Sequence, residues 1–151
     1  MTVEITNRSG ALVPESAMHT LLDFGIKYME LNPACEISLT FVDPQEMEAL
    51  HIKWMDETGP TDVLSFPMDL PEGKGDVVTL GDIVISPAVA AQQAQVAGHS
   101  TDQEIFILAT HGLLHILGYD HADPDEEKVM FALQEKIVKE WSQLWTKYVK
   151  A

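Results

Sequence analysis

The 151 residues of this chain are 46% hydrophobic and 22% charged, which suits one domain, residues 1–151, with a sizeable core. The single cysteine, Cys35, excludes an intrachain disulfide framework and a cysteine-rich metal module. With 24 acidic against 9 basic residues and a formal net charge of −15, the chain lacks a general nucleic-acid-binding surface, and we expect no DNA partner. No apolar run could span a bilayer and no signal peptide is visible, so we expect a cytoplasmic protein without membrane association.

Apolar periodicity predicts strands and helices that alternate at first and end in a run of helices. In chain order, the segments are a strand at 2–7, a helix from about 14 to 31, a strand at 37–41, a helix from 44 to about 54, strands at 63–66 and 80–86, and helices at 87–97, 104–117 and from about 124 onward. This order favours an α+β fold, with a four-stranded mixed sheet covered by about five to six helices.

Several of these helices show which face is apolar. The helix after residue 43 is expected to turn Met47, Leu50 and Trp54 inward. Residues 101–104, Thr-Asp-Gln-Glu, form a capping-box pattern that opens a helix apolar on nearly every face, which is typical of a buried central helix. The last helix carries an apolar stripe that we interpret as core packing, formed by Met130, Leu133, Ile137, Trp141, Leu144 and Tyr148.

Three of the six histidines, His111, His115 and His121, fall within eleven residues. Residues four apart on a helix lie on one face with Cβ atoms about 5–6 Å apart, so His111 and His115 can direct imidazole nitrogens to one point. Gly118 follows where a helix would end in the left-handed conformation. The chain can reverse there and bring His121 back as a third ligand.

Metal binding competes with the ordinary interpretation of a helix histidine as a hydrogen-bonded core residue. Two facing imidazoles without a metal would leave ring nitrogens poorly paired, at a cost of about 1–3 kcal/mol for each group. We therefore predict one zinc ion per chain, because neutral imidazole suits zinc, although copper, nickel and iron accept the same ligands. His19, His51 and His99 stand alone in the sequence and are interpreted as ordinary surface or core histidines.

The same histidine spacing occurs in the metzincin peptidases, whose signature begins His-Glu. This chain has Gly112 in place of that glutamate, which removes the general base of a peptidase. We interpret Gly112 as leaving space for a substrate beside the metal. Three histidines leave a fourth tetrahedral position for water or substrate, which favours a hydrolase. A fourth carboxylate ligand, from Asp82 or Asp120, would instead make the site structural.

Three segments resemble the YbeY family of bacterial rRNA maturation factors, described as single-strand-specific endoribonucleases. They are PTDVLSFP at 60–67, LGDIVIS at 80–86 and HGLLHILGYDH at 111–121, and their order and the chain length extend the resemblance over nearly the whole chain. The resemblance implies that His111, His115 and His121 bind zinc in a metal-hydrolase-like domain. It also implies processing of the 3′ end of 16S rRNA, ribosome quality control, and single-stranded rRNA with the ribosome or its assembly factors as partners.

Other site residues are less certain from the sequence. Asp82 and Asp120 are candidate catalytic residues that would orient a ligand histidine or handle a proton, and the alternative is a turn or cap aspartate. Many members that resemble this chain have an arginine where it has Met55. Lys53 either substitutes for that arginine or is a solvated lysine at a helix end. Two other functions stay open, namely a zinc hydrolase of peptides or small molecules and a non-enzymatic ribosome-assembly factor with structural zinc.

Overall fold

The computed structural model describes residues 2–55, 61–73 and 75–150, apart from the side chains of residue 55 and residues 148–150. Four strands and five helices form this part of the chain, in the order predicted from the sequence. The elements are β1 (Val3–Asn7), α1 (Glu15–Tyr28), β2 (Glu36–Phe41), α2 (Pro44–Met55), β3 (Val63–Pro67), β4 (Thr79–Ile85), α3 (Pro87–Ala97), α4 (Thr101–Ile116) and α5 (Pro124–Lys150).

The four strands form one sheet with the order β1-β2-β4-β3. β1 pairs with β2 and β2 with β4 in parallel, whereas β3 pairs with β4 in antiparallel orientation. Parallel neighbours need a long crossover connection, and α1 supplies it between β1 and β2. The predicted α+β class with a four-stranded mixed sheet is therefore confirmed.

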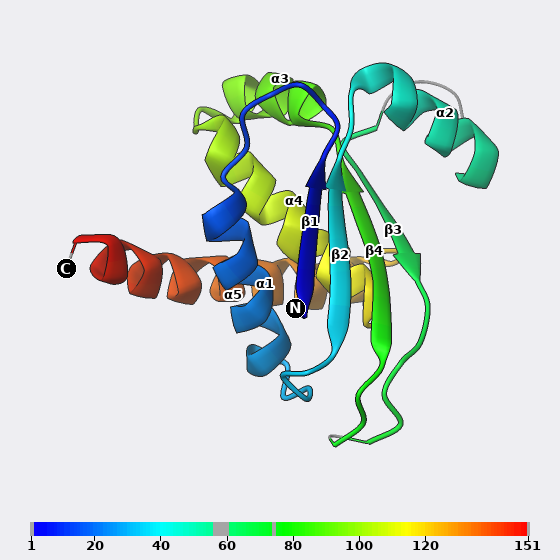
Figure 1. Cartoon of the computed structure of the whole chain (residues 1–151), viewed down its shortest axis with the longest axis vertical. Coiled ribbons are helices and arrows are strands. Elements are labelled where there is room, and N and C mark those ends of the chain that lie inside the picture. Colours follow the sequence, from blue (N-terminus) through cyan, green and yellow to red (C-terminus); the bar gives the residue numbers. More distant parts are fainter. Residues whose placement is uncertain (1, 56–60, 74, 151) are drawn as a thin grey trace.

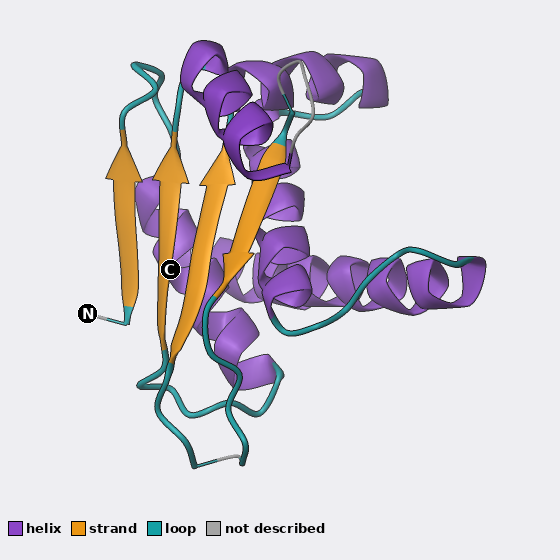
Figure 2. Ribbon diagram, turned by 90° about the vertical axis from the view of Figure 1, so that its right-hand side faces the viewer, coloured by secondary structure: helices purple, strands orange, loops and turns teal. Residues whose placement is uncertain are grey.

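The two faces of the sheet carry different cover. Helices α1, α3, α4 and α5 lie to one side, and α2 lies toward the other (Figures 1 and 2). Successive strand side chains point to alternate faces, so Ile37 and Ile83 enter the main core with α1 and α4. Leu64 and Val84 enter a smaller cluster with Met47 of α2. Side chains of the first set can therefore meet α4, and those of the second set cannot.

The helix α4 lies at the centre of the helical side, as predicted, and contacts α1, α3, α5, β3 and β4. Its N-cap is Ser100, whose side chain accepts the N–H of Gln103 at 3.1 Å. The capping box predicted at residues 101–104 is therefore wrong by one residue. Glu104 contacts His99 instead, with Oε1 2.6 Å from Nε2. Within the described residues, no helix is long and apolar enough to cross a lipid bilayer.

Two large apolar side chains that were predicted to be inside are exposed, Trp54 at 58% and Leu144 at 57%. α2 packs through Met47 near its start, whereas Trp54 lies in its last turn and meets Phe66 edge-on at a centroid distance of 6.1 Å. On α5, Trp141 is buried and Trp145, one turn further along, packs against the main core, so Leu144 lies beside the covered face of the helix. An amphipathic stripe predicts the apolar face, but neighbouring elements decide how much of its length is covered.

Candidate metal centre

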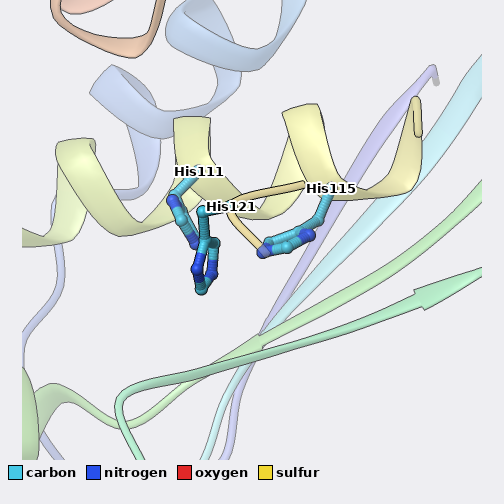
Figure 3. Close-up of side chains that lie close together, drawn as sticks. All are labelled: His111, His115 and His121. Carbon is cyan, nitrogen blue, oxygen red and sulfur yellow. The ribbon is translucent and has the colours of Figure 1, made fainter. Parts of the chain in front are cut away.

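The three predicted histidines lie together at the C-terminal end of α4 (Figure 3). The ring centroids of His111 and His115 are 4.7 Å apart, and His121 lies 5.5 Å from the first and 5.1 Å from the second. One nitrogen from each ring can be chosen so that all three lie within 4.8 Å of one another. Three imidazole donors around one point fit a zinc ion better than a hard cation such as magnesium, which prefers oxygen ligands.

Gly118 brings His121 back to the helix that carries the other two. Its φ of 100° is left-handed, and its N–H donates to the carbonyl of His115 at 3.0 Å, while the N–H of Tyr119 donates to the carbonyl of Leu114 at 3.0 Å. This pair of bonds is the Schellman arrangement that ends a helix and reverses the chain. The turn predicted at Gly118 is confirmed, and it places His121 beside the α4 pair.

Helix α5 supplies two neighbours that the sequence alone did not single out. Gln134 Oε1 lies 2.8 Å from Nδ1 of His111 and accepts its hydrogen, which leaves Nε2 of that ring as the metal donor. The Phe131 ring lies 6.0 Å from His111 and stacks near His121 at 6.1 Å with an interplanar angle of 25°. Phe131 and Gln134 are three residues apart and therefore lie on one face of the helix. This spacing identifies them as a pair only when it is known that this face of α5 points toward the histidines.

We predict that Gln134→Ala lowers metal affinity about 10- to 100-fold, the usual loss when a residue that orients a ligand histidine is removed. A competition titration with a chromophoric chelator measures the effect. Gln134→Glu keeps an acceptor at the same position and should retain most of the affinity. Equal affinity in Gln134→Ala and the unchanged chain would show that the bond to His111 does not orient its ring.

Burial favours the neutral form of the two histidines on α4, His111 and His115. The pKa of His111 is lowered chiefly by burial, which outweighs the raising effect of the hydrogen bond to Gln134. Smaller effects come from His121, which lowers this pKa, and from Asp62, which raises it. The pKa of His115 is also lowered, by burial first and then by His111 and His121. A lowered pKa means that these imidazoles are unprotonated near neutral pH, which is the state that binds a metal.

A cavity of about 440 Å³ opens beside the histidines and is walled by β3 and the residues before it. Asp62 lines it, and its Oδ1 accepts the N–H of Val63 at 2.7 Å and the hydroxyl of Thr61 at 3.4 Å. His51 of α2, which was interpreted from the sequence as an ordinary surface or core histidine, also lines this cavity. Asp62 stands in the PTDVLSFP segment, but no feature of that segment distinguished it before the fold was known.

Two residues predicted for catalysis lie away from this cavity. Asp82 of β4 accepts a hydrogen bond from the hydroxyl of Ser38 and lines a different depression with Trp54 and Phe66. It follows the strand alternation to the face opposite Ile83, which packs against α4. The exposed Lys53 holds its Nζ 5.2 Å from the centroid of the Trp54 ring, and the cavity lining does not include it. The side chain of Met55 lies outside the described residues.

Asp120 is close to the histidines but occupies a turn. Its Oδ1 accepts the N–H of His121 at 2.7 Å, and it lines a groove with Asp125 and Glu126 that is separate from the cavity beside the histidines. Its charge is a minor influence that raises the pKa of His115. The structure therefore supports the turn role that was the alternative for Asp120.

Gly112 serves packing and leaves no space at the metal. A Cβ built on it would lie 2.8 Å from Cγ2 of Ile83 and 3.2 Å from the hydroxyl oxygen of Ser65. That hydroxyl donates to the Gly112 carbonyl at 3.3 Å. The interpretation of Gly112 as room for a substrate is therefore wrong, because its missing side chain lets α4 approach β3 and β4 closely.

Comparison with known proteins agrees with this geometry. The family model described as Endoribonuclease YbeY matches residues 4–142. Endoribonuclease YbeY of Mycobacterium sp. (strain KMS) is 49% identical over 148 residues, covering 93% of this chain and 84% of that protein. The same-named protein of Mycolicibacterium gilvum is 50% identical over 148 residues, covering 93% and 83%.

The fold also has a solved counterpart. The solution structure of TM1509 from Thermotoga maritima superposes with a TM-score of 0.66 and covers 97% of this chain and 93% of that chain. Its sequence is 23% identical, so the likeness concerns the fold alone. The family match over nearly the whole length and the identity to the mycobacterial proteins decide the family. This chain belongs to the YbeY endoribonuclease family.

Proposed function

We propose that this chain is a zinc-dependent, single-strand-specific endoribonuclease that matures the 3′ end of 16S rRNA and takes part in ribosome quality control in the cytoplasm. The observation that carries the proposal is a cluster of three histidines beside a cavity of about 440 Å³ in a member of this family. Three histidine ligands leave a coordination position for chemistry, as in catalytic zinc sites.

His111, His115 and His121 would hold the ion, and bound zinc would supply Lewis-acid charge to a scissile phosphodiester. Asp62 presents a carboxylate in the cavity wall whose Oδ1 is fixed by two hydrogen bonds. That geometry suits it to hold or accept a proton, and His51 provides an imidazole in the same wall for proton exchange. Asp62 and His51 therefore replace Asp82 and Lys53 as the candidates for proton transfer.

The cavity also supports a preference for unpaired RNA. The cavity has the volume of a small-molecule site, and it lies between β3 and the end of α4. A single flexible strand can turn one phosphodiester into such a space, whereas the backbone of a duplex is held outside by its paired strand. With a formal net charge of −15, long-range attraction of free RNA is weak. The ribosome or its assembly factors would supply that proximity, and we propose them as partners.

A substrate comparison tests this proposal. The zinc-loaded protein is incubated with a single-stranded RNA, the same RNA in a duplex, and a peptide library. We expect cleavage of the single strand only. Peptide cleavage that His115→Ala abolishes, with RNA intact throughout, would instead identify a zinc hydrolase of peptides. A third outcome is that neither free RNA nor the RNA of immature ribosomal particles is cleaved, while removal of zinc by a chelator lowers the melting temperature of the protein. In that case the zinc has a structural role in an assembly factor.

A further inference from the structure

A long groove runs between α4 and α5. It has a volume of about 910 Å³ and is lined by Gln103 and Ile107 of α4 and by a row of α5 side chains that begins at Phe131 and ends at Lys147. At the rise of an α-helix, this row spans about 24 Å along α5. A groove of that length has room for several residues of an extended polymer and is longer than one nucleotide needs.

The groove begins at the metal centre. Phe131 and Gln134 line it, and both also contact the histidines, Phe131 through its ring at 6.0 Å from His111 and Gln134 through the 2.8 Å bond to the same ring. A chain that occupies the cavity and passes the histidines therefore meets Phe131 first. This continuity ties the occupant of the groove to the substrate of the proposed nuclease.

The lining has the chemistry of a single-stranded nucleic-acid site. Phe131 is 41% exposed and offers an aromatic face for a base to stack on. Two of the nine basic residues of the chain, Lys139 and Lys147, line the groove with one acid, Glu135. The net charge of the groove lining is therefore positive, although the whole chain has a formal net charge of −15. Neutral amides, including Gln103, can bond to base edges without selecting one sequence.

We infer that the α4–α5 groove binds the unpaired RNA next to the scissile phosphodiester, with a base stacked on Phe131 and phosphates at Lys139 and Lys147. This inference rests on the proposed function, because it takes RNA as the substrate. The groove shares Phe131 and Gln134 with the surroundings of the histidines, but its lining includes none of the three histidines themselves. The inference assigns to α5 a binding role beyond its packing against α4.

Binding of a fluorescein-labelled 2′-O-methyl oligonucleotide to the zinc-loaded full chain tests the groove, with affinity measured by fluorescence anisotropy. Phe131→Leu should bind about 5- to 100-fold more weakly, and Phe131→Tyr should restore binding. The double variant Lys139→Ala/Lys147→Ala should also bind more weakly, and its log–log salt slope should be shallower by about 1.4, since each phosphate contact on a single strand contributes about 0.7.

Matched controls come from the same helix. Lys128 and Lys136 are exposed and lie outside the groove lining, and Leu144 is an exposed apolar residue outside it. Lys128→Ala/Lys136→Ala and Leu144→Ala should therefore bind as the unchanged chain does. The inference is overturned if the two double lysine variants lose the same amount of RNA affinity, or if Phe131→Leu binds RNA as tightly as the unchanged chain. It is also overturned if Phe131→Leu loses zinc in proportion to its loss of RNA binding.

The two proposals fail separately. If the protein cleaves RNA and the groove variants bind RNA normally, the groove is not an RNA site, but the proposed nuclease function stands. Binding that depends on Phe131, without cleavage of any RNA, retains the groove as an RNA site and removes the nuclease.

Discussion

Replacing His115 with alanine should remove the bound metal and abolish RNA cleavage. His115 lies on α4 one turn from His111 and 5.1 Å from His121 by ring centroids, so its loss leaves two donors for an ion that needs more. Metal content should fall from about one equivalent to near zero. Metal charge contributes several kcal/mol to such reactions, so the cleavage rate should fall by about a thousandfold or more. Elemental analysis and cleavage of a labelled single-stranded RNA measure the two effects.

A histidine outside the cluster provides the control. His19 is a half-buried residue of α1 near the start of β1, far from the metal ligands along the chain. His19→Ala removes the same number of atoms and should keep the metal and the cleavage rate. A full equivalent of metal in purified His115→Ala would refute the three-histidine site. Circular dichroism of both variants shows whether any loss comes from unfolding.

The histidine cluster could be predicted because it depends on local geometry. The four-residue spacing of His111 and His115 places them on one helix face whatever surrounds the helix. Gly118 then ends α4 by a local pattern of backbone bonds, which brings His121 back. The strands and the central helix could be predicted because the spacing of apolar residues along each element reflects which of its faces is buried.

The remainder of the site depends on tertiary packing. Strand alternation shows that Asp82 and Ile83 face opposite ways, but only the placement of α4 decides which of them meets the histidines. Asp62 reaches the cavity from the residue before β3 and His51 from α2, and Gln134 reaches His111 from α5. These segments are distant in the sequence, so no spacing rule connects them.

The glycine at position 81 should be the most sensitive backbone position in the sheet. β4 makes a bulge here, because Glu36 pairs with Thr79 while the adjacent Ile37 pairs with Gly81. Gly81 has a φ of 152°, and a Cβ built on it would lie 2.3 Å from the carbonyl oxygen of Phe66. Backbone strain and this overlap together should make Gly81→Ala less stable by about 3–5 kcal/mol. Urea denaturation measures the loss, and melting should fall by about 6–20 °C.

Gly98→Ala is the control that measures the cost of a positive φ alone, without the steric overlap that a Cβ meets at position 81. Gly98 ends α3 with a φ of 81° and has no atom within 4 Å of a built Cβ, so alanine there should cost only about 1–2 kcal/mol. Equal losses in the two variants would mean that β3 can move away from Gly81 at little cost. A larger loss at Gly81 means that β3 is held tightly on β4. Because β3 forms the cavity wall opposite the histidines, the same close pairing then fixes the position of Asp62 relative to the metal centre.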